Sequence, residues 1–138
     1  MNRTDFDDFC ASLPAVENVV QWGNASVWKV GGKIFAICSH WGPGETEKIS
    51  FKCSDLTYAI LSEQEGIVPA PYLARAKWVQ LVLKDAMTED DIKAYIEKAY
   101  FHMLAKQLAN VLPHFLFYIL VTADGQVKYS VLEQAIQL

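Results

Sequence analysis

The 138-residue chain lacks the features that most readily reveal a protein's class. Its longest apolar run, residues 115–121, is far shorter than the roughly 20 residues of a membrane-spanning helix. Its three cysteines are odd in number and widely spaced, which does not indicate a disulfide framework. No phosphate-binding loop, dinucleotide fingerprint, nucleophile elbow or zinc-protease motif occurs. We therefore expect no membrane association, no cofactor and no enzymatic activity of the commonly recognised kinds.

The composition is that of a folded domain. Hydrophobic residues make up 52% of the chain and charged residues 20%, whereas disordered chains combine low hydrophobicity with high net charge. The length suits one domain with its own core. The first residues are polar and acidic, so we expect no export signal and a location in the reducing cytoplasm. We expect a monomer.

The charge is unevenly distributed along the chain. The net charge of −4 disfavours a dedicated nucleic-acid binder, which usually carries a basic footprint. However, residues 1–20 and 85–138 each carry a net −3, whereas residues 21–84 carry a net +2. The positive charge therefore lies in the middle third.

Local patterns predict an α+β fold in which helices cover one face of an antiparallel sheet. Gly31-Gly32 lies between two β-rich runs and predicts a hairpin turn, because such turns need positive φ angles. Thr4, Ser54 and Thr88 are the predicted helix N-caps, and Gly66 is the predicted end of the second helix. The predicted helices lie between 4 and 14, at 56–65 and at 88–110; the predicted strands are 26–30, 33–39, 48–53 and 77–83. An additional C-terminal hairpin is predicted over 115–132 from its Asp124-Gly125 signal.

Basic and aromatic residues alternate in the middle third, with a dense cluster in the segment 72–78. Lysine and arginine suit phosphate contacts, and tyrosine and tryptophan suit base stacking. The alternative is a solvated sheet face on which lysines protect the strand edges. The predicted nucleic-acid contacts are Lys29, Lys33, Lys48, Lys52, Tyr72, Arg75, Lys77 and Trp78.

Two further interpretations stay open. Acidic residues at the starts of the first and last helices suit capping, but they could also form a ridge for a divalent cation. These residues are Asp5, Asp7, Asp8, Glu89, Asp90 and Asp91.

Cys38, His40 and Cys53 are too scattered to resemble a zinc site, so we expect core thiols. The apolar residues 115–121 would suit a protein-interaction or dimer surface.

Several runs resemble the MmcQ/YjbR-like family in the right order. These runs are 27–36 (VWKVGGKIFA), 51–53 (FKC), 71–73 (PYL) followed by 77–79 (KWV), and the helical stretch 91–108. The resemblance covers about residues 4–110, which divides the chain into a domain, 1–110, and an extension of unknown role, 111–138. It implies a frataxin-like (CyaY-like) α/β sandwich and a "double-wing" mode of DNA binding, in which hairpins act as wings.

Carried over by position, the resemblance places Lys33 on the first hairpin and Lys52 on the third strand. It places Tyr72, Arg75, Lys77 and Trp78 on the second motif. The expected function is therefore a small binding protein with DNA as its candidate partner. The alternatives are a frataxin-like metal-binding module that uses the acidic helix starts, and a protein-interaction module without nucleic acid.

Overall fold

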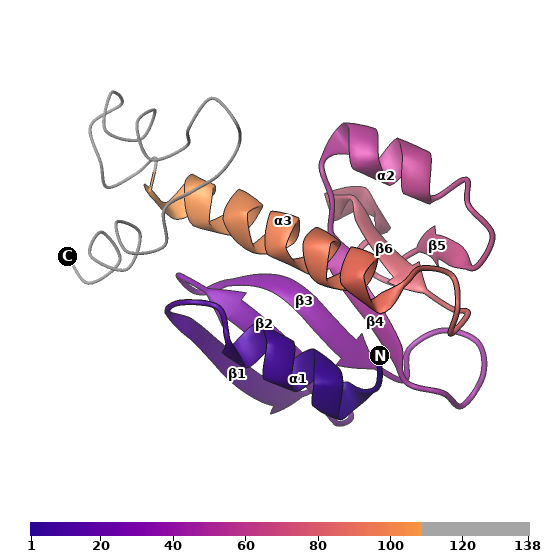
Figure 1. Ribbon diagram of the computed structural model, residues 1–138, viewed down its shortest axis with the longest axis horizontal. Helices are drawn as coiled ribbons and strands as arrows, with labels where there is room; N and C mark the ends of the chain where they lie inside the picture. Colours follow the sequence, from indigo (N-terminus) through magenta and orange to yellow (C-terminus); the bar gives the residue numbers. More distant parts are fainter. Residues whose placement is uncertain (109–138) are drawn as a thin grey trace.

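The computed structural model describes residues 1–108, which form a six-stranded antiparallel sheet and three α-helices (Figure 1). The sheet order is β1-β2-β3-β4-β6-β5. The strands are β1 Val16–Gln21, β2 Ala25–Val30, β3 Lys33–Ser39, β4 Lys48–Lys52, β5 Ile67–Pro69 and β6 Trp78–Leu81. The helices are α1 Arg3–Ala11, α2 Asp55–Leu61 and α3 Glu89–Leu108, with a short 3-10 helix η1 at Ala74–Ala76. Among these residues no helix is long and apolar enough to cross a bilayer.

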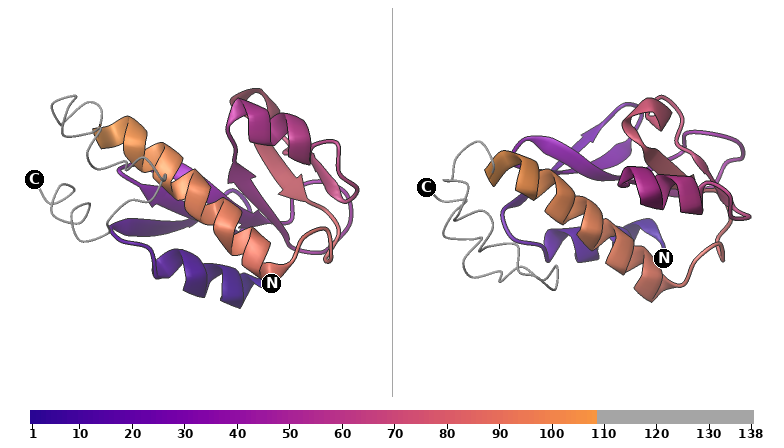
Figure 2. Two further views of the ribbon diagram at one scale, coloured as in Figure 1. Left: turned by 45° about the horizontal axis from the view of Figure 1, so that its top comes forward. Right: turned by 90° about the horizontal axis from the view of Figure 1, so that it is seen from above.

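All three helices pack on the same face of the sheet, which confirms the predicted α+β arrangement (Figure 2). Strand alternation sends Ile49, Phe51 and Cys53 of one strand segment into this core, as their spacing predicts. Phe51 stacks on Tyr95 of α3 with ring centroids 5.7 Å apart, and the Phe35 ring meets the edge of Tyr100 at 5.5 Å. These aromatic contacts fix α3 across the middle of the sheet.

The opposite face of the sheet is also apolar, although no helix in residues 1–108 packs on it. Cross-strand register puts Val27 beside Ile37, and Trp78 lies on the same face. Two connecting segments cover part of this face, contributing Trp41 from the β3–β4 loop and Leu73 from the β5–β6 connection. The first loop is anchored where the Gln80 side-chain amide donates to the Trp41 carbonyl, at 2.8 Å.

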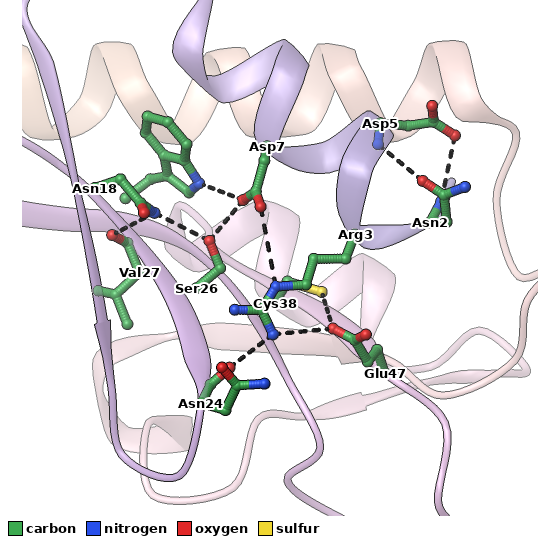
Figure 3. Close-up of polar contacts among 11 residues, drawn as sticks. Asn2, Arg3, Asp5, Asp7, Asn18, Asn24, Ser26, Val27, Cys38 and Glu47 are labelled. Carbon is green, nitrogen blue, oxygen red and sulfur yellow. Dashed lines mark hydrogen bonds and ion pairs between the residues drawn. The ribbon is translucent and has the colours of Figure 1, made fainter.

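A polar network joins α1 to the sheet (Figure 3). The Asp7 carboxylate accepts hydrogen bonds from the Ser26 hydroxyl at 2.5 Å and from the Trp28 indole at 2.9 Å. The Arg3 guanidinium bonds the Glu47 carboxylate at 3.3 Å and donates to a backbone carbonyl of the β1–β2 turn. The start of α1 is thereby held against β2 and the β3–β4 loop.

Most predicted boundaries hold, and the exceptions have physical reasons. Gly31 and Gly32 both have positive φ, as the predicted hairpin turn requires. Ser54 and Thr88 accept the bonds expected of N-cap residues, but α1 is capped by Asn2 rather than Thr4. The second helix ends at Leu61, before Gly66, whose positive φ serves the turn into β5.

Two strands were not predicted. β1 is an edge strand with many exposed side chains, and so it carries no clear hydrophobic alternation. β5 has three residues and ends at Pro69, so it is too short to show an alternating pattern. The predicted hairpin over 115–132 and the division at residue 110 lie outside the described residues.

We expect Asp7→Ala to lower the free energy of unfolding by about 1–3 kcal/mol, because it leaves the Ser26 hydroxyl and the Trp28 indole without their acceptor. Asp8→Ala is the matched control, since this neighbouring carboxylate is exposed. We expect the control to change stability by less than about 0.5 kcal/mol. Urea unfolding of both variants checks this, and equal effects would contradict a structural role for the Asp7 network.

Candidate functional site

A groove of about 640 Å³ lies on the sheet face opposite the helices. Its floor is apolar and comes from β3 and β6 and from the β5–β6 connection, through Ile34, Ile37, Trp78 and Leu73. Aromatic residues form the rim at one end of the groove. The β2–β3 turn and α3 form the opposite end. The residues at the rim are Trp22, Trp41 and Tyr72, and those at the other end are Gly32, Lys33 and Met103. A concave apolar surface of this size suits ligand binding.

The three rim residues come from three different connections and touch in series. The Trp22 and Trp41 rings have centroids 5.7 Å apart, and the Trp41 and Tyr72 rings meet edge to face at 5.9 Å. Tyr72 is nevertheless 91% exposed and Trp22 51% exposed. The rim therefore presents aromatic surface to solvent.

The backbone at the rim is strained. Trp22 and Tyr72 have φ angles of +53° and +67°, a left-handed region that bulky side chains rarely adopt. Such conformations cost on the order of 1–3 kcal/mol each and cluster at functional sites. Neither ring is fully buried, so hydrophobic burial does not offset the backbone strain. The strain therefore indicates a role at the surface.

The predicted site residues divide into two groups. Lys33, Tyr72 and Trp78 line the groove, so three positions far apart in the sequence meet at one surface. The remaining predicted residues lie elsewhere, and the structure removes one of them from the interface. Lys48 is only 2% exposed and its ammonium donates to the Thr46 carbonyl at 2.8 Å, so it is not available for phosphate contact.

The other predicted cations remain nearer the surface. Lys29 is half-buried on β2, and Arg75 is exposed in η1. The Lys52 ammonium donates to the Ala76 carbonyl, and the Lys77 ammonium lies 5.0 Å from the centre of the Tyr58 ring, toward α2. These cations differ in their distance from the groove. Lys33 is part of its lining, whereas the Lys77 side chain points toward α2.

The cations of this interface lack carboxylate partners within the described part of the chain. Both ion pairs found there belong to Arg3, with Asp7 and with Glu47. Burial lowers the pKa of Lys52, and the nearby positive charge of Lys106 lowers it further. A surface of cations without carboxylate partners favours an anionic ligand.

Two rim residues, Trp22 and Trp41, were missed by the sequence reasoning. Each precedes a glycine in a connection between two strands, at Trp22-Gly23 and Trp41-Gly42. A tryptophan in a glycine-containing turn lies outside the alternation by which strand residues are assigned to the core. That local signal could have placed both residues at a binding surface.

The structure does not gather the acidic residues or the thiols into a site. Asp7 is committed to Ser26 and Trp28, and residues 1–108 contain no group of three histidine, cysteine or acidic side chains placed to hold a metal ion. The Cys38 thiol donates to Glu47 at 3.4 Å. Burial raises the pKa of Cys38 to about 12 and that of Cys53 to about 11. Both are therefore thiols of the core, as expected.

Comparison with known proteins gives a family and a fold. The YjbR family model matches residues 11–102. The crystal structure of Deinococcus radiodurans protein DR2400, with a DUF419 domain, is 16% identical over 83% of each chain, with a TM-score of 0.66. A Pseudomonas syringae protein is 19% identical over 75% of this chain and 99% of its own, with a TM-score of 0.63. At these identities the two structures show the shared fold alone. No curated protein matches the sequence.

We expect the native protein to react very slowly with a thiol reagent such as Ellman's reagent at pH 8. The raised pKa values of Cys38 and Cys53 leave almost no thiolate at that pH, and burial raises the pKa of Cys10 as well. In denaturant all three should react at once. A thiol that reacts rapidly in the folded protein would contradict this burial.

Proposed function

The chain belongs to the YjbR family, and from that premise we propose that it binds nucleic acid through the groove. In this proposal unstacked bases lie on the aromatic rim and the backbone phosphates contact the unpaired cations beside it. We propose further that it acts in the cytoplasm as a monomer, since the three free cysteines of the described residues suit a reducing compartment.

The exposed series of aromatic rings carries the proposal. Base–aromatic stacking contributes about 1–3 kcal/mol per base and tolerates any sequence, because every base has a π-face. Trp22 and Tyr72 offer such faces to solvent, and Trp41 supports both. A base inside a duplex is already stacked and cannot enter the groove. Single strands should therefore bind more tightly than duplexes, although Lys33 at the hairpin tip also suits a wing on duplex DNA.

The electrostatics favour modest, salt-dependent binding. The net charge of −4 repels a polyanion at long range, so that local cations must provide the attraction. Among the predicted cations, Lys33 lines the groove, Lys29 and Lys52 are the cross-strand partners of Ile34 and Trp78 in its floor, and Arg75 is exposed in η1. Four phosphate contacts on a single strand give a log–log salt slope of about −3.

A protein segment is the second candidate ligand. The floor of the groove is formed by Ile34, Ile37, Leu73 and Trp78, which would accept apolar side chains as well as bases. Such a ligand would bind with little salt dependence, because burial of apolar surface is not screened by ions. The salt series separates this candidate from nucleic acid.

We expect Tyr72→Ala to weaken binding of a fluorescent oligothymidylate by at least about fivefold, because it removes one stacking surface. The side chain is 91% exposed, so the fold should be retained. Leu56→Ala is the matched control, since this exposed apolar residue lies on α2, away from the groove. Fluorescence anisotropy measures both variants, and equal affinities for the two would contradict stacking at the rim.

We expect Lys33→Ala to flatten the salt slope for the same oligonucleotide by about 0.7, the loss of one phosphate contact on a single strand. Lys84→Ala is the control, because this exposed lysine lines a different pocket, near the N-terminus. A duplex of the same length forms a parallel arm of the experiment. Absence of binding at low salt, or binding that ignores salt, would defeat the nucleic-acid proposal.

A further inference from the structure

A second, smaller cavity of about 140 Å³ lies where the end of β4, the start of α2 and the middle of α3 meet. Positively charged and polar side chains from all three elements line it. These are Lys52, Lys98, His102, Ser54 and Thr57, with the Tyr95 ring as a wall. Its size admits a small tetrahedral ion. No acidic side chain is part of its lining.

His102 presents an unsatisfied atom at this place. Its Nε2 atom is buried and has no hydrogen-bond partner among the described residues. A buried polar atom without a partner costs free energy, so a ligand that accepts or donates a hydrogen bond there would be stabilised. The imidazole can supply a donor in its protonated form or in one neutral tautomer.

The two lysines of the cavity also have free bonding capacity. An ammonium has three donors, and Lys52 uses one of them on the Ala76 carbonyl. Lys98 lies 5.1 Å from the centre of the Tyr95 ring, which leaves its charge unneutralised. Residues 1–108 contain no carboxylate within 4 Å of either ammonium.

The charges around His102 come from three elements, and most are positive. Burial lowers the pKa of His102, and the charges of Lys106 and Lys52 lower it further, whereas Asp55 opposes them more weakly. The same Lys106 charge acts on Lys52. Cations held near one another around a small cavity are stabilised together when an anion enters it.

We propose that this cavity binds a phosphate monoester or inorganic phosphate, held by Lys52, Lys98 and His102 with the hydroxyls of Ser54 and Thr57. A tetrahedral dianion offers several acceptor oxygens, which suits converging donors from three elements. A phosphodiester is less suitable, since the chain must enter and leave a cavity with room for one small group.

The cavity and the groove share no lining residue, but two lining residues of one are neighbours of lining residues of the other. The inference does not depend on the proposed function. His102 precedes Met103 of the groove lining, and Lys52 is the cross-strand partner of Trp78 in the groove floor. A single strand with a terminal phosphate could therefore place that group in the cavity and its nearest base in the groove. Only this extension rests on the proposed function.

The direct test is a proton NMR titration of the histidine ring signals in the full chain, with inorganic phosphate added at constant ionic strength against chloride. Bound phosphate should raise the pKa of His102, because an anion favours the imidazolium. His40 is the internal control, since it is exposed on the β3–β4 loop. His102→Gln identifies the signal.

Variants of α3 test the lining. Lys98→Gln should weaken phosphate binding about fivefold, the effect of one partly exposed ion pair. Lys93→Gln is matched, because this lysine is also on α3 and also lies over an aromatic ring, that of Phe9, but is outside the cavity. Equal effects of the two variants, or equal shifts of His102 and His40, would show general screening and overturn the inference.

Oligonucleotides with and without a 5′-phosphate separate the two proposals. Tighter binding of the phosphorylated strand by the wild-type chain, lost in Lys98→Gln, would support the cavity as a terminal-phosphate site. If no oligonucleotide binds but inorganic phosphate still shifts His102, the proposed function fails and the cavity proposal stands. If oligonucleotides bind but phosphate leaves the pKa of His102 unchanged, the cavity proposal fails and the proposed function stands.

Discussion

The central physical constraint is that the sheet is apolar on both faces, whereas the three described helices cover only one. On the helix face, aromatic contacts such as Phe51 on Tyr95 close the core. On the other face, two connecting segments of residues 1–108 pack against Val27, Ile37 and Trp78. Apolar surface left in contact with water is costly, so partial cover leaves a groove with an intrinsic affinity for apolar or aromatic groups.

The same arrangement places charge beside that groove. The end of β4 and the C-terminal part of α3 lie close enough for the charge of Lys106 to lower the pKa of Lys52. Met103 and Lys33 line one end of the groove. The acidic side chains near the start of α1 are used differently, since Asp7 and Glu47 bind α1 and the β3–β4 loop together. An anionic protein thus keeps a local surface that suits an anionic, aromatic ligand.

The sequence was sufficient for the fold class and for most of the elements, because these depend on local signals. Gly31-Gly32 requires its turn, and the alternation of Ile49, Phe51 and Cys53 requires one face. The family resemblance is also confirmed. Burial of Lys48, whose ammonium bonds the Thr46 carbonyl, was not predictable, and neither was the meeting of three aromatic residues from three connections. Such contacts are set by tertiary structure rather than by spacing along the chain.

The four tryptophans allow the most direct test of the claim that the binding surface is the sheet face opposite the three described helices. Trp22 and Trp41 are at the rim of the groove, whereas Trp28 lies on the helix face with its indole bonded to Asp7. The measurement is the ¹H–¹⁵N spectrum of the indole groups during addition of an oligothymidylate. We expect the Trp22 and Trp41 signals to shift while the Trp28 signal stays in place. No shift at the rim, or an equal shift of Trp28, would contradict it.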